Sequence, residues 1–329
     1  MEAKAKFPFI VTNSIKRIYN VLDELRTVGY LEEGDTNCLI TGESGSGKSE
    51  LVKRYAERYP RQELEEFTYI PVVYVKLSSP QSSKAFAVQI LRGIGDPQEG
   101  KGAKTKEELF ERIQILCREC RVELIILDEV QTVIQNRSSG VVASISDWFK
   151  DLMNDTNVPI VMVGMPWCLG FVQDNDQLDT RVGYRYYLES FRVSERFDQY
   201  IKFISLFSRN FDFDEKFSLS ELENAYRLFA YSSGVVRATV GQIIKATNIA
   251  KSRNQGVDLE CFQEALRSRG IKDESNVFII PVKKLELREI VDKSRWVQQK
   301  SYRKERFKSA EYKIYTLNDK MELQVGRED

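Results

Sequence analysis

The sequence predicts an α/β fold, with a five-stranded parallel sheet flanked by helices and followed by a smaller all-helical domain. Three observations lead to this prediction. A glycine-rich loop at residues 42–49 lies between an apolar strand segment and a helical segment. Apolar strands then alternate with helices as far as about residue 192, which is typical of a parallel sheet covered by helices. From about residue 194 onward only helical patterns follow.

The composition narrows the possible chemistry. The chain has 329 residues, of which 49 are basic and 49 acidic, so any nucleic-acid surface must come from local patches. It contains no histidine, which excludes histidine-dependent nucleophilic catalysis and histidine-ligated metal sites. Its five cysteines are scattered, and neither a signal peptide nor an apolar run of membrane-spanning length is found. We therefore expect a cytoplasmic protein without disulfides and without a membrane partner.

The first 35 residues are expected to form an N-terminal segment and one amphipathic helix that packs on the core. Asn13 or Ser14 is a suitable N-cap for this helix. Residues 37–41, which follow, have the apolar composition of a short buried strand.

The loop after this strand is Gly42-Glu43-Ser44-Gly45-Ser46-Gly47-Lys48-Ser49, which fits the phosphate-binding pattern G-x-x-x-x-G-K-[ST] at every fixed position. Its glycines allow the backbone N–H groups to surround a polyphosphate at a helix N-terminus. Lys48 is expected to reach the β- and γ-phosphates, and the Ser49 hydroxyl to ligate Mg²⁺. The alternative is a chance glycine-rich turn, which the flanking strand and helix make less favourable.

The next segments alternate as the fold requires. Residues 72–77 are β-branched and predict a strand, and residues 81–92 predict a helix. Residues 93–104 are rich in glycine and lysine, which indicates an exposed loop, and Thr105 is expected to cap a helix that runs to about Cys120.

A second nucleotide signature follows at residues 122–129, where an apolar strand ends in Asp128 and Glu129. Asp128 is expected to lie near Ser49 and to hold Mg²⁺ directly or through water. Glu129 is expected to polarise the water that attacks the γ-phosphate. A strand that simply enters an acidic turn is the alternative, but its position downstream of a phosphate-binding loop favours the catalytic interpretation.

The remaining elements complete the predicted architecture. A helix over 141–154, a strand over 158–164, a helix from about Trp167 and a strand at 186–188 finish the sheet. Helices are expected near 194–208, 218–232, 235–252 and 258–269. The expected division is an N-terminal segment (1–35), an α/β core (36–192), a helical lid (193–270) and a basic tail (271–329).

This order of parts resembles the AAA+ P-loop ATPases over about residues 8–270. The lid contains Ser233-Gly234-Val235-Val236-Arg237, which is similar to the sensor-2 pattern of that family. The resemblance implies that Arg237 contacts the γ-phosphate and that Arg181 is the arginine finger for a neighbouring subunit, with Arg185 as the runner-up. The alternatives are a solvated Arg237 and a surface ion pair between Arg181 and Asp179.

More narrowly, the chain resembles the TnsC/TniB branch, the ATP-dependent regulators of DNA transposition, including the compact members of CRISPR-associated transposons. The similar stretches are residues 41–49, Ile126-Leu127-Asp128-Glu129-Val130-Gln131, residues 159–166 and Gln177-Leu178-Asp179-Thr180-Arg181. This resemblance implies ATP and Mg²⁺ as cofactors and a homo-oligomeric ring or filament on double-stranded DNA. The implied partners are transposase subunits and a target-selection protein or CRISPR-associated targeting complex.

One departure from the family concerns the end of the fourth strand. The family usually carries a polar sensor-1 residue there, which helps to position the attacking water, but this strand ends in Gly164-Met165. Hydrolysis is therefore expected to be slow, or another residue takes over this task.

Candidate DNA contacts are Lys101, Lys104 and Lys106, in and after the glycine-rich loop, and Arg137, in the loop after the Asp-Glu strand. Lysine and arginine contacts to phosphates would give sequence-independent, salt-sensitive binding, and a solvated basic loop is an equal alternative. Residues 283–308 carry ten basic and four acidic residues among isolated aromatics; partner docking is preferred there over DNA binding or partial disorder. Cys117 and Cys120 form a single C-x-x-C, for which two ordinary thiols are the preferred interpretation.

Three functions remain open from the sequence. The first is a transposition regulator that assembles on DNA with ATP. The second is another DNA-associated AAA+ loader for a replication origin or a helicase. The third is an ATP-switched oligomeric adaptor with little hydrolysis.

Overall fold

The computed structural model describes residues 8–28, 36–78, 83–103, 105–135, 139–296 and 307–326. The chain forms two compact units. The sheet unit comprises residues 13–188 and 294–309, and the helical unit comprises residues 1–12, 189–293 and 310–329. The expected tail is thus divided between the two units.

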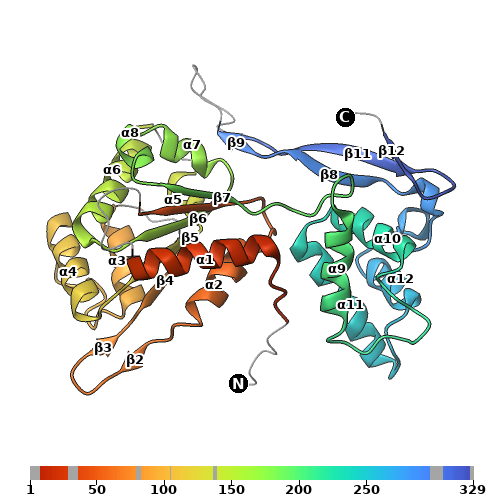
Figure 1. The fold of residues 1–329 in the computed structure, drawn as a ribbon, viewed down its shortest axis with the longest axis horizontal. Coiled ribbons are helices and arrows are strands. Elements are labelled where there is room, and N and C mark those ends of the chain that lie inside the picture. The colour runs from red at the N-terminus through yellow and green to blue at the C-terminus, as the bar shows by residue number, and fades with distance from the viewer. Residues whose placement is uncertain are drawn as a thin grey trace. The chain divides into compact units, whose positions relative to one another are not determined.

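The sheet unit is built on the expected parallel sheet (Figure 1). Its strand order is β4-β5-β6-β1-β7, and every neighbouring pair is parallel. The strands are β1 (Cys38–Thr41), β4 (Val72–Lys76), β5 (Leu124–Asp128), β6 (Ile160–Gly164) and β7 (Tyr184–Tyr187). Thr41 at the end of β1 is paired with Gly164 on one side and Tyr187 on the other. The carboxyl ends of the three strands therefore meet where the phosphate-binding loop begins.

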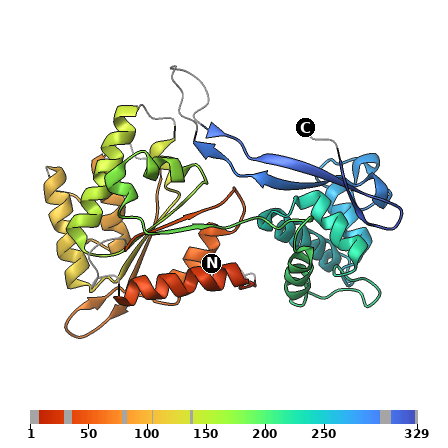
Figure 2. The same ribbon diagram turned by 45° about the horizontal axis from the view of Figure 1, so that its top comes forward.

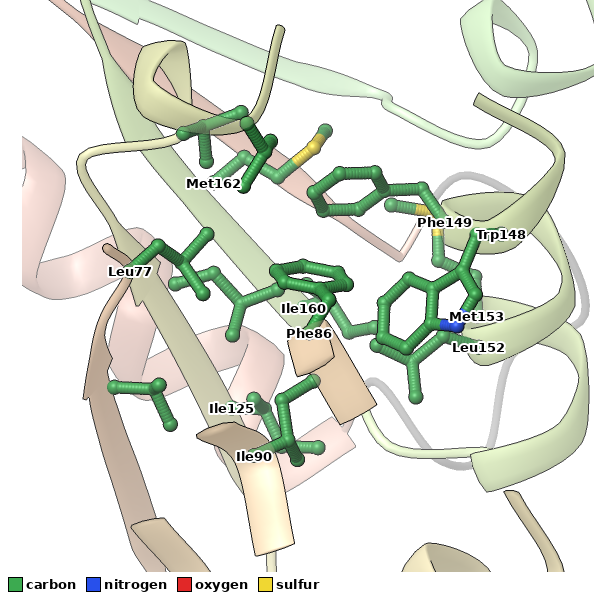
Figure 3. Packing of buried hydrophobic residues seen from close by; sticks show 14 of the residues in the cluster. Leu77, Phe86, Ile90, Ile125, Trp148, Phe149, Leu152, Met153, Ile160 and Met162 are labelled. Carbon is green, nitrogen blue, oxygen red and sulfur yellow. The ribbon is translucent and has the colours of Figure 1, made fainter. Parts of the chain in front are cut away.

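Helices cover one face of the sheet through a continuous apolar core. They are α3 (Ser83–Ile94), α4 (Lys106–Glu119), α5 (Gln131–Ile134), α6 (Ser139–Thr156), α7 (Cys168–Gln173) and α8 (Asp176–Asp179). Figure 3 shows Phe86, Trp148 and Phe149 packed beside Ile125 and Ile160 of the sheet. The rings of Phe86 and Trp148 are 4.0 Å apart between centroids.

The opposite face is approached by α1 (Asn13–Val28) and α2 (Lys48–Ala56), which Figure 2 shows on the same side of the sheet. The two helices are joined by tyrosines: Tyr55 and Tyr59 both donate to Asp23 Oδ1, at 2.8 and 2.7 Å. A short hairpin, β2 (Gln62–Glu63) with β3 (Thr68–Tyr69), follows α2. These contacts hold the helix that begins with Lys48.

The helical unit contains the four expected helices, α9 (Phe197–Ser208), α10 (Leu222–Ser232), α11 (Val236–Ser252) and α12 (Leu259–Arg267). It also contains two 3₁₀ turns (Asp273–Ser275 and Val282–Lys284) and an unexpected antiparallel sheet of β8 (Leu287–Asp292), β11 (Glu311–Leu317) and β12 (Leu323–Val325). Leu287, Tyr315 and Leu317 are buried with the helices in one apolar cluster. The sheet therefore stabilises this unit.

The other part of the tail returns to the sheet unit. It forms the antiparallel pair β9 (Arg295–Trp296) and β10 (Phe307–Lys308), and β9 lies against α7. Across the parts of the chain that the structure describes, no helix has both the length and the apolar character needed to cross a membrane.

Candidate nucleotide-binding site

The phosphate-binding loop lies between β1 and α2, as its sequence pattern predicts. Gly45 and Gly47 have φ values of 84° and 101°, in the left-handed region that favours glycine. A Cβ atom on Gly42 would lie 2.7 Å from both the Leu188 carbonyl oxygen and Ser46 Oγ. These positions therefore require glycine for reasons of backbone geometry and space.

The side chains of the loop have the chemistry that a polyphosphate requires. Lys48 is buried, and its Nζ donates to the carbonyl oxygens of Gly42 at 2.7 Å and Glu43 at 3.0 Å. Ser46 Oγ is also buried, and no partner for it is found among the described residues. The Ser46 hydroxyl and the Lys48 ammonium of this loop are both hydrogen-bond donors, and phosphate oxygens can accept from both groups. Ser49, the expected Mg²⁺ ligand, follows in the first turn of α2.

Asp128 lies at the end of β5 and is almost completely buried. Its Oδ1 accepts from the Glu129 backbone N–H at 2.8 Å, and its Oδ2 accepts from the Tyr74 hydroxyl at 2.9 Å. Burial raises the pKa of Tyr74 above its usual range, and so does the neighbouring Asp128, so the phenol remains a hydrogen-bond donor. Tyr74 is not among the residues expected from the sequence, although a tyrosine hydroxyl in the middle of a β-branched strand was a signal for it.

The structure brings Lys48 together with both carboxylates. Burial lowers the pKa of Lys48, and the charges of Asp128 and Glu129 oppose that shift. This coupling arises because the parallel strands β1 and β5, with β6 between them, end at the same edge of the sheet, which brings together two motifs that are 80 residues apart in the chain.

Glu129 has a φ value of 64°, which is unusual for a residue with a side chain. Its carboxylate accepts from the amide of Gln131, the first residue of α5. The oxygen of the same amide accepts from the Met165 backbone N–H at 3.2 Å, immediately after β6. The end of β6, where a polar sensor-1 residue was expected from the resemblance, is thus next to Gln131 of α5.

The two candidate finger arginines have different surroundings. Arg181 donates from Nε to the Asn154 side chain at 2.8 Å and from Nη1 to the Gln177 carbonyl oxygen at 2.6 Å. Arg185 instead pairs with Asp179 at 2.9 Å. Among the described residues, Asp179 thus pairs with Arg185, and Arg181 is held by Asn154 and Gln177 instead.

Arg237 lies in the first turn of α11 in the helical unit, and its side chain is exposed. The preceding Gly234 has a φ of 71°, and a Cβ there would lie 2.1 Å from the Phe191 carbonyl oxygen. The glycine of the sensor-2 pattern is therefore required for the close approach of two backbone segments.

The candidate DNA contacts separate into two groups. Lys104 and Arg137 lie outside the described residues. Lys101 is exposed, but Lys106 pairs with Asp151 at 3.0 Å and lies 5.1 Å from the centre of the Phe110 ring. The charge of Lys106 is thus partly neutralised by a neighbouring carboxylate.

The loop that carries Lys101 is held in shape by a buried carboxylate. Asp96 accepts from the backbone N–H of Gln98 at 3.1 Å and Gly100 at 2.6 Å, and from Arg112 at 2.5 Å. The exposed loop expected from the sequence is therefore an organised turn.

The C-x-x-C has ordinary thiols. Burial raises the pKa of Cys117 to about 12 and also raises that of Cys120, so neither thiol ionises readily. Among the described residues, no cluster of three or more cysteines, aspartates and glutamates is arranged to hold a metal ion.

The loop also makes a contact that its pattern does not foresee. Glu43 is buried, and both of its carboxylate oxygens accept from Ser294, a residue of the tail. No local signal in the sequence connects these residues, because they are 251 positions apart.

The comparison with family models decides the family. Residues 4–189 match the model described as bacterial TniB protein. The chain belongs to the TniB family. This match includes the phosphate-binding loop, Asp128, Glu129 and Arg181. The comparison with curated proteins gives no match.

Solved structures share the fold of this TniB-family chain. Cdc6p of Pyrobaculum aerophilum has a TM-score of 0.58 and 14% identity, with 83% of this chain and 72% of that one covered. ORC2 of Aeropyrum pernix, in ADPNP and ADP complexes, has a TM-score of 0.57 and 12% identity, with 83% and 72% covered. ORC1 of the same organism, in complex with DNA, has a TM-score of 0.54 and 18% identity, with 80% and 66% covered. The predicted AAA+ P-loop fold is thereby confirmed.

Proposed function

We propose that the protein is an ATPase that regulates DNA transposition: it assembles with ATP on double-stranded DNA and links target selection to recruitment and activation of the transposase. The observation that carries this proposal is the convergence of Lys48, Asp128 and Glu129 at one end of the sheet, in a chain of the TniB family. These are the groups that phosphoryl transfer requires.

Each residue has a distinct task in ATP hydrolysis. The loop N–H groups and Lys48 bind phosphate oxygens, for which Lys48 exchanges its present carbonyl partners. Ser49 and Asp128 would hold Mg²⁺, which neutralises phosphate charge when bound. Tyr74 keeps Asp128 in place. Glu129 orients the attacking water and takes up its proton.

Assembly would complete this site from a second subunit. Arg181 is proposed to reach the γ-phosphate bound by a neighbour, and Arg237 that of its own subunit. Both guanidiniums can form such contacts without breaking an ion pair seen among the described residues, whereas Arg185 must leave Asp179. This difference favours Arg181 as the finger.

DNA binding is proposed for the surface that carries Lys101, together with Lys104, Lys106 and Arg137. The even overall balance of charge means that such a surface must be local. Support comes from the related fold of ORC1, whose structure contains DNA. The basic tail is proposed to dock transposase subunits, and a target-selection complex would bind elsewhere on the oligomer.

The test is electron microscopy of the wild type and Glu129→Gln, each with and without ATP and duplex DNA. The expected result is a ring or filament only when ATP and DNA are both present, and more persistent in Glu129→Gln because hydrolysis is blocked. A soluble oligomer that forms without DNA would support the adaptor function instead.

A pull-down with a candidate transposase separates the two DNA-associated functions. Retention of transposase by the ATP-bound, DNA-bound form is expected. Retention of a replicative helicase instead would support a loader, which the shared fold with Cdc6p makes the second candidate.

A further inference from the structure

A continuous polar connection runs from the end of β6 to the carboxylate of Glu129. Its middle member is Gln131, which donates from Nε2 to Glu129 Oε2 and accepts at Oε1 from the Met165 backbone N–H at 3.2 Å. The three residues come from a strand end, a strand-to-helix turn and a short helix.

The direction of these hydrogen bonds follows from the partners. The Met165 N–H can only donate, so it requires the oxygen of the Gln131 amide. The Glu129 carboxylate can only accept when ionised, so it requires the amide nitrogen. Glutamine is the residue whose one side chain satisfies both at this spacing, whereas glutamate would lack the donor and lysine the acceptor.

Strand β6 itself has no room for a polar side chain at its last position. A Cβ atom on Gly164 would lie 2.7 Å from Cys168 Sγ and 3.0 Å from Gln131 Oε1. The next residue, Met165, has an apolar side chain. The amide of Gln131 therefore fills the space beside the strand end.

Glu129 also needs an external contact to fix its direction. Its backbone has a positive φ of 64°, a conformation that persists only when its surroundings hold it. Its N–H is fixed by Asp128 at 2.8 Å, and among the described residues Gln131 is the side chain found to hold its carboxylate. No hydrogen-bond partner of the other carboxylate oxygen, Oε1, is found in the part of the chain that the structure describes.

We propose that Gln131 is a positioning residue that takes over the task of the missing sensor-1 side chain: it ties the water-activating carboxylate of Glu129 to the end of β6. This inference rests on the proposed ATPase function. It explains how a strand ending in Gly164-Met165 can still belong to a hydrolytic site.

Two substitutions of Gln131 separate the effect of its hydrogen bonds from the effect of its side-chain volume. Gln131→Met keeps the length and volume and removes both hydrogen bonds. It should lower kcat about tenfold or more while leaving the KM for ATP and nucleotide binding within about twofold, because Gln131 acts on the water-activating group. Gln131→Glu keeps an acceptor for Met165 N–H but replaces the donor with a second carboxylate.

The pH profile gives a readout that a purely structural role would not move. Two adjacent carboxylates raise the apparent pKa of the pair, so the acidic limb of kcat should move to higher pH in Gln131→Glu. Thr132→Val is the matched control, since Thr132 lies on the same helix and its hydroxyl bonds to the Leu77 carbonyl oxygen at 3.4 Å. This control should keep the wild-type kcat and pH profile.

The outcomes distinguish the positioning role of Gln131 from the proposed ATPase function. If Glu129→Gln abolishes hydrolysis but Gln131→Met and Gln131→Glu keep the wild-type kcat and pH profile, the ATPase function stands and the positioning role is overturned. If the wild type binds ATP but shows no turnover, even in single-turnover assays with DNA, both proposals are overturned. Equal losses in Thr132→Val and Gln131→Met would also overturn the positioning role.

Discussion

Ser294 donates two hydrogen bonds to the carboxylate of Glu43, from its backbone N–H at 2.7 Å and from its hydroxyl at 3.1 Å. Both residues are buried. Glu43 is also a residue of the phosphate-binding loop, and its carbonyl oxygen accepts from Lys48. The start of the tail hairpin is therefore in direct contact with the loop. A change in the tail is expected to alter the conformation of the loop where phosphate is expected to bind.

Ser294→Ala is expected to weaken both the fold and ATP binding. It removes one hydrogen bond to a buried carboxylate, which costs about 1.5–3 kcal/mol when the group is charged. Thermal unfolding and titration with a fluorescent ATP analogue measure the two effects. Ser309→Ala is the control, because Ser309 is exposed on the same tail segment. Equal affinities in both variants would show that the contact does not influence the loop.

Lys48→Ala should lose ATP binding and DNA-dependent assembly together. Removal of the ammonium should raise the Kd for ATP by more than tenfold, which corresponds to about 1.4 kcal/mol. Calorimetry measures binding, and electron microscopy with DNA measures assembly. Assembly at the wild-type level would contradict the proposed coupling between nucleotide and oligomer.

The buried state of Lys48 also predicts a pH dependence. Its pKa is lowered by burial, so the free protein loses this positive charge at a lower pH than an ordinary lysine would. ATP affinity should therefore fall as the pH rises through that lowered pKa. The folded state binds fewer protons than the unfolded state in this range, so stability should change in the opposite sense and rise with pH. Between pH 7 and pH 10, the measured Kd for ATP and the Tm should therefore both rise.

Arg181→Ala should bind ATP as a monomer but fail to assemble or to hydrolyse it. The sharper experiment mixes Arg181→Ala with Lys48→Ala subunits, neither of which is expected to hydrolyse ATP alone. Each mixed interface that combines an intact Lys48 with an intact Arg181 should recover activity. Arg185→Ala is the comparison, and it loses an ion pair with Asp179. If Arg185→Ala, and not Arg181→Ala, is inactive alone and recovers activity when mixed with Lys48→Ala, Arg185 is the finger.

Tyr74→Phe should raise the Mg²⁺ concentration needed for hydrolysis and should change the affinity for ATP less. The substitution removes the hydroxyl that donates to Asp128 at 2.9 Å and keeps the ring in the strand. A lost hydrogen bond to a charged group corresponds to about 1.5–3 kcal/mol, or roughly tenfold or more in the Mg²⁺ concentration for half-maximal hydrolysis. Magnesium titrations of the ATPase rate check this, with Tyr69→Phe, a tyrosine of the β2–β3 hairpin, as the control. An unchanged titration would remove Tyr74 from the site.

The sheet and its helices were predictable because their signals are local. Residues 38–41, 72–76, 124–128, 160–164 and 184–187 form the five strands close to the expected positions. Thr105 caps α4 by accepting from the Glu108 N–H at 3.2 Å, as its position before a helical run predicts. Apolar periodicity and capping depend on neighbours in the chain, and a single sequence contains that information.

The short strands of the tail were not predictable in the same way. Residues 287–292 and 311–317 pair although residues 293–310 separate them in the chain, and their apolar side chains fill the same cluster as the helices of that unit. Charged residues lie between these apolar positions, so the apolar alternation typical of a strand is weak. The sequence therefore predicted only a basic tail.

The sequence alone determined that this protein has a phosphate-binding loop, an Asp-Glu strand and the order of parts of a TniB-family ATPase, because each is written in consecutive residues. Only the tertiary structure decided which groups hold these residues. Tyr74 on Asp128, Gln131 on Glu129 and Ser294 on Glu43 are hydrogen bonds between separate elements. Such bonds depend on distance and direction in space, which follow from strand order and packing and leave no local pattern in the chain.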